Sequence, residues 1–367
     1  MKFRTFFWIL IIGAIAVFAS GLLGMGWLAS KSSLALLRGG VNRFPAGAVF
    51  VPKQAPAMVS VSSNPEKLLA LRQVTLPLNK RKSDRLEWQA WEESLAAKIG
   101  FSYQRDFKPW LGDEITFAIT SLDSDRNSRN GAQPGYILAA ETRNNNLAQE
   151  SLANFYQEQD GIDLESYKGA NIIFPRKSST LWSSAVVGDF VLFANQPQII
   201  KTAINQAQAV NLSLKQSPSY QTVLNNLPHP HIALGYGDIL ALSAWLDKSA
   251  EFKPLAYRGN SGISLSIEGT KLVAHTISIK DKNFTANKTF LDNPELQQIF
   301  DSLSFNNRDL AYIDLQNGKS LLEDRIPLYK VTKLAIKSLF PHLKAIAIKK
   351  LEPQNNIDRL KVSLELD

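Results

Sequence analysis

The sequence predicts an α+β protein in which an N-terminal transmembrane helix is followed by a large soluble domain of mainly antiparallel sheet. Three observations lead to this prediction. A long uncharged stretch lies near the start of the chain, from Phe6 to Ala29. Most of the expected strands come in pairs that are close in sequence, as they are in hairpins. An order of strand, helix and hairpin recurs three times, so we expect three degenerate strand–helix–hairpin units.

The uncharged stretch has the length of a membrane span. Its 24 residues would form a helix of about 36 Å, against a hydrocarbon core of about 30 Å. The apolar part of a cleavable signal peptide is shorter, about 7–15 residues, so we expect an uncleaved anchor. Cleavage after Ala19 is the alternative. We expect the N-terminus in the cytoplasm, because a long following domain can translocate regardless of the flanking charges.

Three small residues in this stretch are spaced by four: Ala16, Ser20 and Gly24. They would share one face of a helix, and small residues there let a second membrane helix approach closely. The alternative is a chance alignment in a segment rich in small residues.

Composition divides the chain into three parts. Residues 1–30 form the expected transmembrane anchor. Residues 31–56 are rich in glycine and proline and are expected to be a flexible tether. Residues 57–367 form the soluble α+β domain, for which a subdivision near 211–230 is an option.

Each of the three expected units starts with a strand that leads into a helix, and two strands that could pair follow later. The first strands are Met58–Ser62, His231–Tyr236 and Leu310–Leu315, and the pairs are Glu114–Leu122 with Gly135–Thr142, Gly262–Glu268 with Lys271–Ile279, and Leu343–Lys350 with Arg359–Leu366.

An additional set of elements lies between the first and second units. It is expected to consist of a helix at Asn146–Glu158, strands at Tyr167–Phe174, Trp182–Val187 and Phe190–Ala194, a helix that begins at Pro197, and a helix at Tyr220–Leu227.

The composition excludes several classes of chemistry. The chain has no cysteine, which removes disulfides, thiolate metal sites and cysteine nucleophiles. Its net charge of +8 favours anionic partners, but no nucleic-acid-binding module is present. A predicted helix at Leu328–Phe340 carries Lys330, Lys333 and Lys337 on one side, where they could contact an anionic membrane surface. An ordinary solvated helix face is the alternative.

Three stretches resemble a known family: Phe107–Asp123, Pro134–Glu141 and Ala185–Asn195. The sequence is similar to a cyanobacterial family of single-span membrane-anchored proteins that is catalogued only as a domain of unknown function. The resemblance covers nearly the whole chain. It implies a plasma or thylakoid membrane and supplies no catalytic residues.

Four motifs were considered as sites, and each lacks a required group. His229 and His231 have no third ligand nearby, and a calcium loop from Asp123 would have serine in place of its glycine. The loop Gly318–Ser320 lacks the first glycine of a phosphate-binding loop, and Gly235–Gly237 lacks the third glycine of a dinucleotide fingerprint. We therefore expect no catalytic residue, cofactor or metal.

These observations favour a non-enzymatic binding or scaffold module on the extracytoplasmic side, periplasmic or thylakoid-lumenal. Its partners would be other membrane proteins or anionic lipid rather than nucleic acid. The alternative is a carrier or sensor of an apolar ligand such as lipid or pigment, in a cavity lined by tryptophans, namely Trp88, Trp91, Trp110, Trp182 and Trp245. A hydrolase with carboxylates assembled by the fold is the third hypothesis.

Overall fold

The computed structural model describes twelve stretches of the chain, and all structural statements below concern them. They are residues 44–62, 83, 107–125, 133–157, 159–176, 181–229, 231–237, 259–268, 271–280, 310–314, 343–354 and 357–366.

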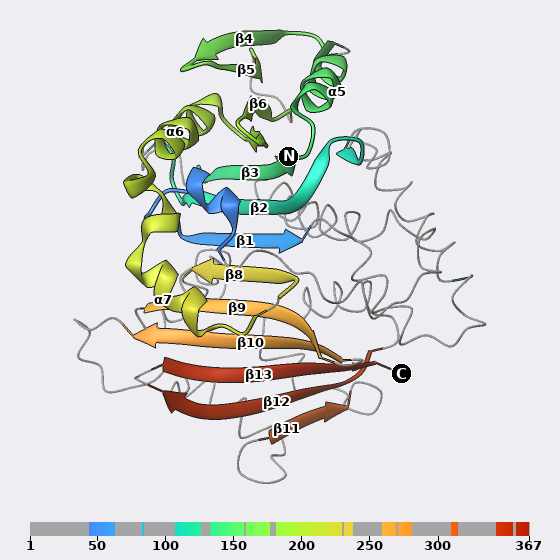
Figure 1. The fold of residues 1–367 in the computed structure, drawn as a ribbon, viewed down its shortest axis with the longest axis vertical. Coiled ribbons are helices and arrows are strands. Elements are labelled where there is room, and N and C mark those ends of the chain that lie inside the picture. The colour runs from blue at the N-terminus through green and yellow to red at the C-terminus, as the bar shows by residue number, and fades with distance from the viewer. Residues whose placement is uncertain are drawn as a thin grey trace.

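Most of these residues belong to strands, with few helices between them (Figure 1). The elements in chain order are η1 (Ala46–Phe50), β1 (Ala57–Ser62), β2 (Leu111–Ser121), β3 (Gly135–Thr142), α5 (Asn145–Gln157), β4 (Ile162–Tyr167), β5 (Ala170–Pro175), β6 (Ser183–Val187), β7 (Phe190–Ala194), α6 (Pro197–Gln208), η3 (Val210–Leu212), η4 (Leu214–Gln216), α7 (Pro218–Asn226), β8 (Ala233–Gly237), β9 (Gly259–Glu268), β10 (Lys271–Lys280), β11 (Leu310–Asp314), β12 (Leu343–Gln354) and β13 (Ile357–Leu366).

The described strands form one sheet of 13 strands in the order β11-β12-β13-β10-β9-β8-β1-β2-β3-β7-β6-β5-β4. All neighbours are antiparallel. Three groups repeat one arrangement: β1-β2-β3, β8-β9-β10 and β11-β12-β13. The groups join because their outer strands pair with each other, β8 with β1 and β10 with β13.

The predicted fold class needs correction. We expected separate strand–helix–hairpin units behind a transmembrane helix, but the described residues form mostly one continuous antiparallel sheet. The physical reason is that the outer strands carry backbone groups that need partners, and the adjoining group supplies them. The expected helices of the three units, and the span Phe6–Ala29, lie outside the described residues. Among the helices that are described, none is long and apolar enough to cross a membrane.

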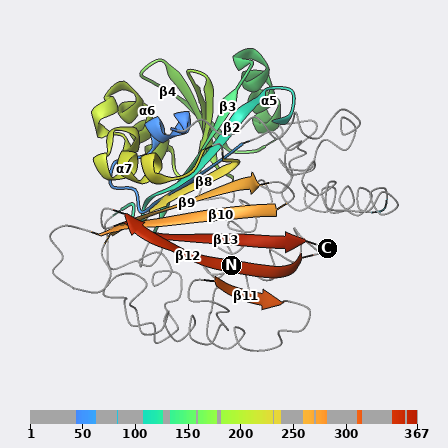
Figure 2. The same cartoon turned by 60° about the horizontal axis from the view of Figure 1, so that its bottom comes forward.

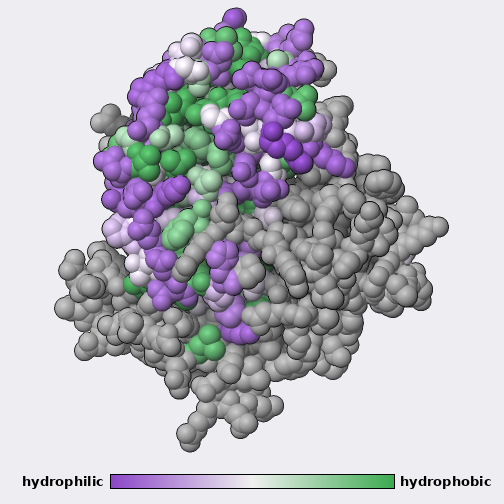
Figure 3. All heavy atoms as spheres, viewed as in Figure 1, coloured by the Kyte–Doolittle hydropathy of each residue, from purple (hydrophilic) through white to green (hydrophobic). Residues whose placement is uncertain are grey.

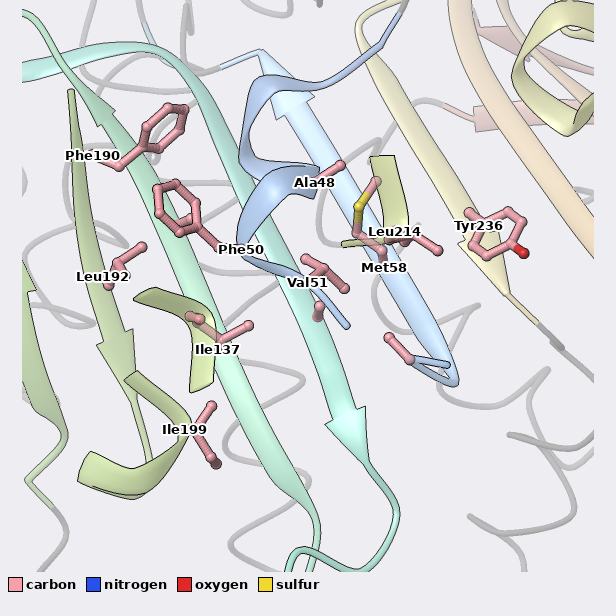
Figure 4. Packing of buried hydrophobic residues seen from close by; sticks show 14 of the residues in the cluster. Ala48, Phe50, Val51, Met58, Ile137, Phe190, Leu192, Ile199, Leu214 and Tyr236 are labelled. Carbon is pink, nitrogen blue, oxygen red and sulfur yellow. The ribbon is translucent and has the colours of Figure 1, made fainter. Parts of the chain in front are cut away.

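The larger hydrophobic cluster lies on one face of the sheet, beneath η1, α6 and α7 (Figure 2). Both α6 and α7 begin with a proline, Pro197 and Pro218, whose fixed φ suits the first helical turn. Alternate residues of the central strands point to this face, as Phe190 and Leu192 of β7 do. Side chains from η1 meet them there, and the Phe50 ring packs edge-on against Phe190 at 5.2 Å between ring centroids (Figure 4).

The second hydrophobic cluster lies on the opposite face, where α5 packs (Figure 2). It takes the alternate residues of the same strands, such as Val191 and Phe193 of β7. Trp110, which is 1% exposed, lies in this cluster next to Phe107. The central strands are therefore apolar on both faces, unlike a half-solvated antiparallel sheet.

The structure places residues 46–56 in the folded domain, although the sequence analysis assigned them to the flexible tether. Ala48 and Val51 are fully buried, and Leu214 donates its backbone N–H to the Val51 carbonyl at 2.8 Å. Pro52 forms an isolated bridge with Ser213. This stretch, although rich in glycine and proline, thus forms a short helix and a turn that pack on the sheet, rather than a free linker.

The strand that was predicted over Tyr167–Phe174 is also corrected. Residues 170–174 belong to β5, whereas Lys168 and Gly169 form a hairpin turn and Tyr167 is the last residue of the preceding strand, β4. Both turn residues have positive φ, +48° and +84°. A two-residue turn of this kind matches the twist of antiparallel strands and is usually made by Asn-Gly or Asp-Gly. Because lysine is unusual at the first position of such a turn, the sequence does not indicate a hairpin here.

Candidate functional site at the open edge of strand β4

The residues that were predicted to contact a membrane or lipid lie outside the part of the chain that the structure describes. Outside the described residues lie Ala16, Ser20, Gly24, Lys330, Lys333 and Lys337, together with the loop Gly318–Ser320 and three of the five tryptophans, Trp88, Trp91 and Trp245.

The two described tryptophans, Trp110 and Trp182, belong to one hydrophobic cluster. Trp110 fills the cluster beneath α5, and the half-buried Trp182 accepts a hydrogen bond at its backbone carbonyl from the Tyr156 hydroxyl. Both act as packing residues in the part of the chain that the structure describes.

The histidine pair lies in the turn between α7 and β8. The rings of His229 and His231 stack at 5.0 Å between centroids. Nδ1 of His231 lies 3.2 Å from the Pro228 carbonyl oxygen, so we assign Nδ1–H as the donor. Burial lowers the pKa of His231, and nearby His229 lowers it further, against the Pro228 hydrogen bond that raises it. Within the described stretches, no three His, Cys, Asp or Glu side chains are grouped to hold a metal.

The other two motifs have structural roles. Asp123 accepts the Gln133 N–H at 3.3 Å across the β2–β3 connection, whereas Asn127 lies outside the described residues. Gly237 has φ +147°, and an added Cβ would lie 2.3 Å from the Pro56 carbonyl oxygen. Glycine is required there because β8 approaches β1 closely, and this explains the Gly235–Gly237 pattern without a nucleotide.

Glu114 is a buried carboxylate that the sequence analysis did not single out. Its side chain, 3% exposed, accepts the Ala46 and Gly47 N–H groups at 2.9 and 2.8 Å and the Thr116 hydroxyl at 2.9 Å. Burial raises the pKa of Glu114; the three hydrogen bonds lower it, and Glu141 raises it slightly further, so the net direction is upward. Both oxygens have donors, and the bonds to Ala46 and Gly47 hold η1 on the sheet.

The open edge of β4 is the feature of the described structure best suited to a partner. Among the described strands, β4 is the last of the sheet and pairs only with β5. The backbone N–H of Arg176 donates to the Gly161 carbonyl at 2.8 Å. This bond shows which residues of the hairpin direct their backbone groups toward the paired strand. In an antiparallel pair, the backbone N–H and C=O groups of every second residue point toward the neighbouring strand, and those of the residues between them point away. The backbone groups of Ile162, Leu164 and Ser166 therefore point away from β5, along the open edge.

Side chains on the α6 side hold this edge in place. Glu165 pairs with Lys201 of α6 at 2.7 Å, and Asp163 pairs with Arg176 at 2.7 Å. The Tyr167 hydroxyl donates to Asn205 of α6 at 3.1 Å. Both carboxylate side chains remain 41% exposed, so they can still interact with a neighbour at the edge.

The other side of β4 is apolar and partly open. Ile162 packs on the cluster beneath α5, whereas Leu164 is 66% exposed, the largest value among the exposed large hydrophobic residues described. Figure 3 shows hydrophobic atoms among hydrophilic ones at the top of the molecule, the end where Figure 1 places β4. The edge thus combines open backbone groups, an exposed leucine and two acidic side chains.

This edge was not predicted, because the strand expected over Tyr167–Phe174 overlaps β5 and contains only the last residue of β4. A signal was available: residues 162–167, Ile-Asp-Leu-Glu-Ser-Tyr, alternate between apolar or aromatic and polar residues over most of their length, and a Lys-Gly pair follows them.

Comparison with known proteins identifies the family. Residues 10–288 and 278–366 match the family DUF3352, which is described as a protein of unknown function. The chain belongs to this family. No curated protein matches the DUF3352 chain significantly. The expected cyanobacterial source and single-span anchoring stay predictions.

Solved structures that match the chain include two of a protein named TP0453. Crystal form III has a TM-score of 0.39 and 8% identity, over 87% of this chain and 93% of that chain. Crystal form I has a TM-score of 0.36 and 9% identity, over 89% of this chain and 92% of that chain.

Proposed function

We propose that this DUF3352 protein is a non-enzymatic binding or scaffold module that docks a partner protein on the open edge of β4. The observation that carries the proposal is the outward direction of the backbone groups of Ile162, Leu164 and Ser166. An extended segment laid beside β4 would form about six main-chain hydrogen bonds, two for each outward residue. This is binding by strand addition, in which the backbone supplies affinity and the flanking side chains supply specificity.

The edge strand β4 is preorganised for the addition of a strand. The contacts of Glu165 and Tyr167 with α6 fix the hairpin against a helix of the core. Little ordering of β4 would then be needed upon binding, so more of the interaction would appear as affinity.

The cellular location is a further part of the proposal. We place the sheet on the extracytoplasmic side of a plasma or thylakoid membrane, where its partners would be other membrane proteins. Protease treatment of sealed vesicles checks this side. Digestion of the sheet only after the cytoplasmic side is opened would contradict it. Contact of Lys330, Lys333 and Lys337 with anionic lipid stays a prediction, for which liposome flotation of the charge-reversed variant is the measurement.

The docking edge is tested with two matched leucine variants of the full chain. Leu164→Lys places a charge on the edge, where charges oppose strand pairing. Leu212→Lys places the same charge at another exposed leucine, which is 54% exposed in η3. Proteins that co-purify from gently solubilised membranes with the wild type and with Leu212→Lys should be lost with Leu164→Lys. Retention of the same proteins by Leu164→Lys, or a wild type that is always solitary, would contradict the proposal.

A further inference from the structure

We infer that the segment accepted by β4 carries basic residues at the two positions opposite Asp163 and Glu165, with an apolar residue between them. The inference rests on the proposed docking function and defines the chemistry of the partner. The two acidic side chains share the α6 side of β4, and Leu164 lies between them on the other side.

The position of these side chains determines what can lie opposite them. In an antiparallel pair, directly opposed residues have Cβ atoms about 4.5–5.5 Å apart, so their side chains interact. Opposite charges at this distance are favourable and like charges are unfavourable. A basic–apolar–basic segment would place a cation beside each 41% exposed carboxylate and an apolar side chain beside Leu164.

The existing cations leave these carboxylates accessible. Arg176 is 64% exposed and is linked to Asp163 through Nε alone in the described contact. Lys201 approaches Glu165 from α6, where it also lies 5.7 Å from the Tyr167 ring centroid. Both cations come from the inner side of β4, so the outer side of each carboxylate faces the position of an added strand.

The same charges oppose a second copy of the chain as the occupant. Two β4 strands that pair antiparallel with the greatest overlap are centred on Leu164, because outward residues must face outward residues. Asp163 of one copy would then lie opposite Glu165 of the other, and the reverse pair would form as well. Two acid–acid contacts disfavour this dimer, whereas a basic segment from a different protein relieves them.

The experiment uses three labelled seven-residue peptides and the full chain. The first has the sequence Thr-Val-Lys-Val-Lys-Val-Thr, the second has glutamate in place of both lysines, and the third repeats the first with N-methyl groups that block alternate backbone donors. Fluorescence anisotropy measures binding to the wild type, to Leu164→Pro, which removes an outward N–H, and to Leu212→Lys as control. Circular dichroism checks that each variant is folded.

We expect the lysine peptide to bind the wild type and Leu212→Lys about tenfold more tightly than the glutamate peptide, since two favourable pairs become two unfavourable ones. Leu164→Pro and the N-methylated peptide should each lose binding. Equal binding of the lysine and glutamate peptides, lost upon N-methylation, would overturn the inference and leave the docking function standing. Binding that survives N-methylation, or no binding by either peptide, would overturn both. A wild-type dimer in sedimentation that Leu164→Lys dissociates would replace the partner by a second copy.

Discussion

Two neighbouring tyrosines on the helix-covered face lead to opposite predictions for the loss of a hydroxyl group. Tyr220 of α7 and Tyr236 of β8 meet edge to face, with ring centroids 5.1 Å apart. The Tyr236 hydroxyl donates to Asn260 Oδ1 at 2.9 Å. The Tyr220 hydroxyl is fully buried and has no hydrogen-bond partner in the described part of the chain.

The expected free-energy changes follow from these contacts. Tyr236→Phe removes the hydrogen bond to Asn260, which is worth about 0.5–1.5 kcal/mol, and a longer contact of 3.3 Å with the Ser219 hydroxyl. The half-buried Asn260 can bond to water instead. Tyr220→Phe removes a buried hydroxyl whose unsatisfied state costs about 1–3 kcal/mol. Part of this gain is offset by lost contacts of the oxygen atom. We therefore expect Tyr220→Phe to raise the free energy of unfolding by about 1 kcal/mol and Tyr236→Phe to lower it by a similar amount.

Urea unfolding of the full chain at neutral pH, followed by tryptophan fluorescence, measures both changes. Far-UV circular dichroism before unfolding serves as the control for native structure. A loss of stability in Tyr220→Phe as large as that in Tyr236→Phe would refute the reasoning, because it would show that the Tyr220 hydroxyl has a partner such as a buried water.

Two further predictions concern pH. The folded-state pKa of Glu114 is raised above its ordinary value of 4.5, so its contribution to stability is fully present below about pH 4.5 and is lost as pH rises through the folded-state pKa. The stability of the wild type relative to Glu114→Gln should fall as pH rises from about pH 4 to pH 8 in urea unfolding, whereas Glu150→Gln, at an exposed glutamate of α5, serves as the matched control. The same slope in both comparisons would contradict this prediction. The folded-state pKa of His231 is lowered from 6.5, so its contribution is fully present above about pH 6.5 and is lost as pH falls through the folded-state pKa. Thermal unfolding between about pH 7 and pH 5 should show a smaller loss of stability in His231→Gln than in the wild type. An unchanged loss in His231→Gln would show that burial of this imidazole has no such effect.

Local patterns were sufficient for three elements between β3 and α7, namely α5, β7 and the start of α6. The expected helix at Asn146–Glu158 is found one residue earlier as α5, and the strand at Phe190–Ala194 is found as β7. Pro197 begins α6 as predicted. Each of these has a strong short-range signal, either an apolar period or a proline at the first helical position.

Features that depend on distant residues could not be predicted in this way. Residues 46–50 have the glycine and proline content of a linker, yet they fold because Glu114, 67 residues from Gly47, accepts their N–H groups. Strand β2 contains two adjacent acidic residues, Asp113 and Glu114, and nothing local shows which of them is buried or which groups donate to it. The positive φ of Lys168 could not be predicted either, because lysine rarely adopts this backbone conformation.

The edge strand β4 is better described as selective for a partner strand than as protected from all strand pairing. Exposed edges invite pairing between copies, and short length and charge are the usual means of preventing it. β4 has only six residues, and two of them are acidic. Neither feature blocks the outward groups of Leu164 and Ser166, as a proline or a bulge would. Charge therefore opposes the pairing of like strands while favouring strands of opposite charge, so the same two carboxylates that prevent self-association would select the partner.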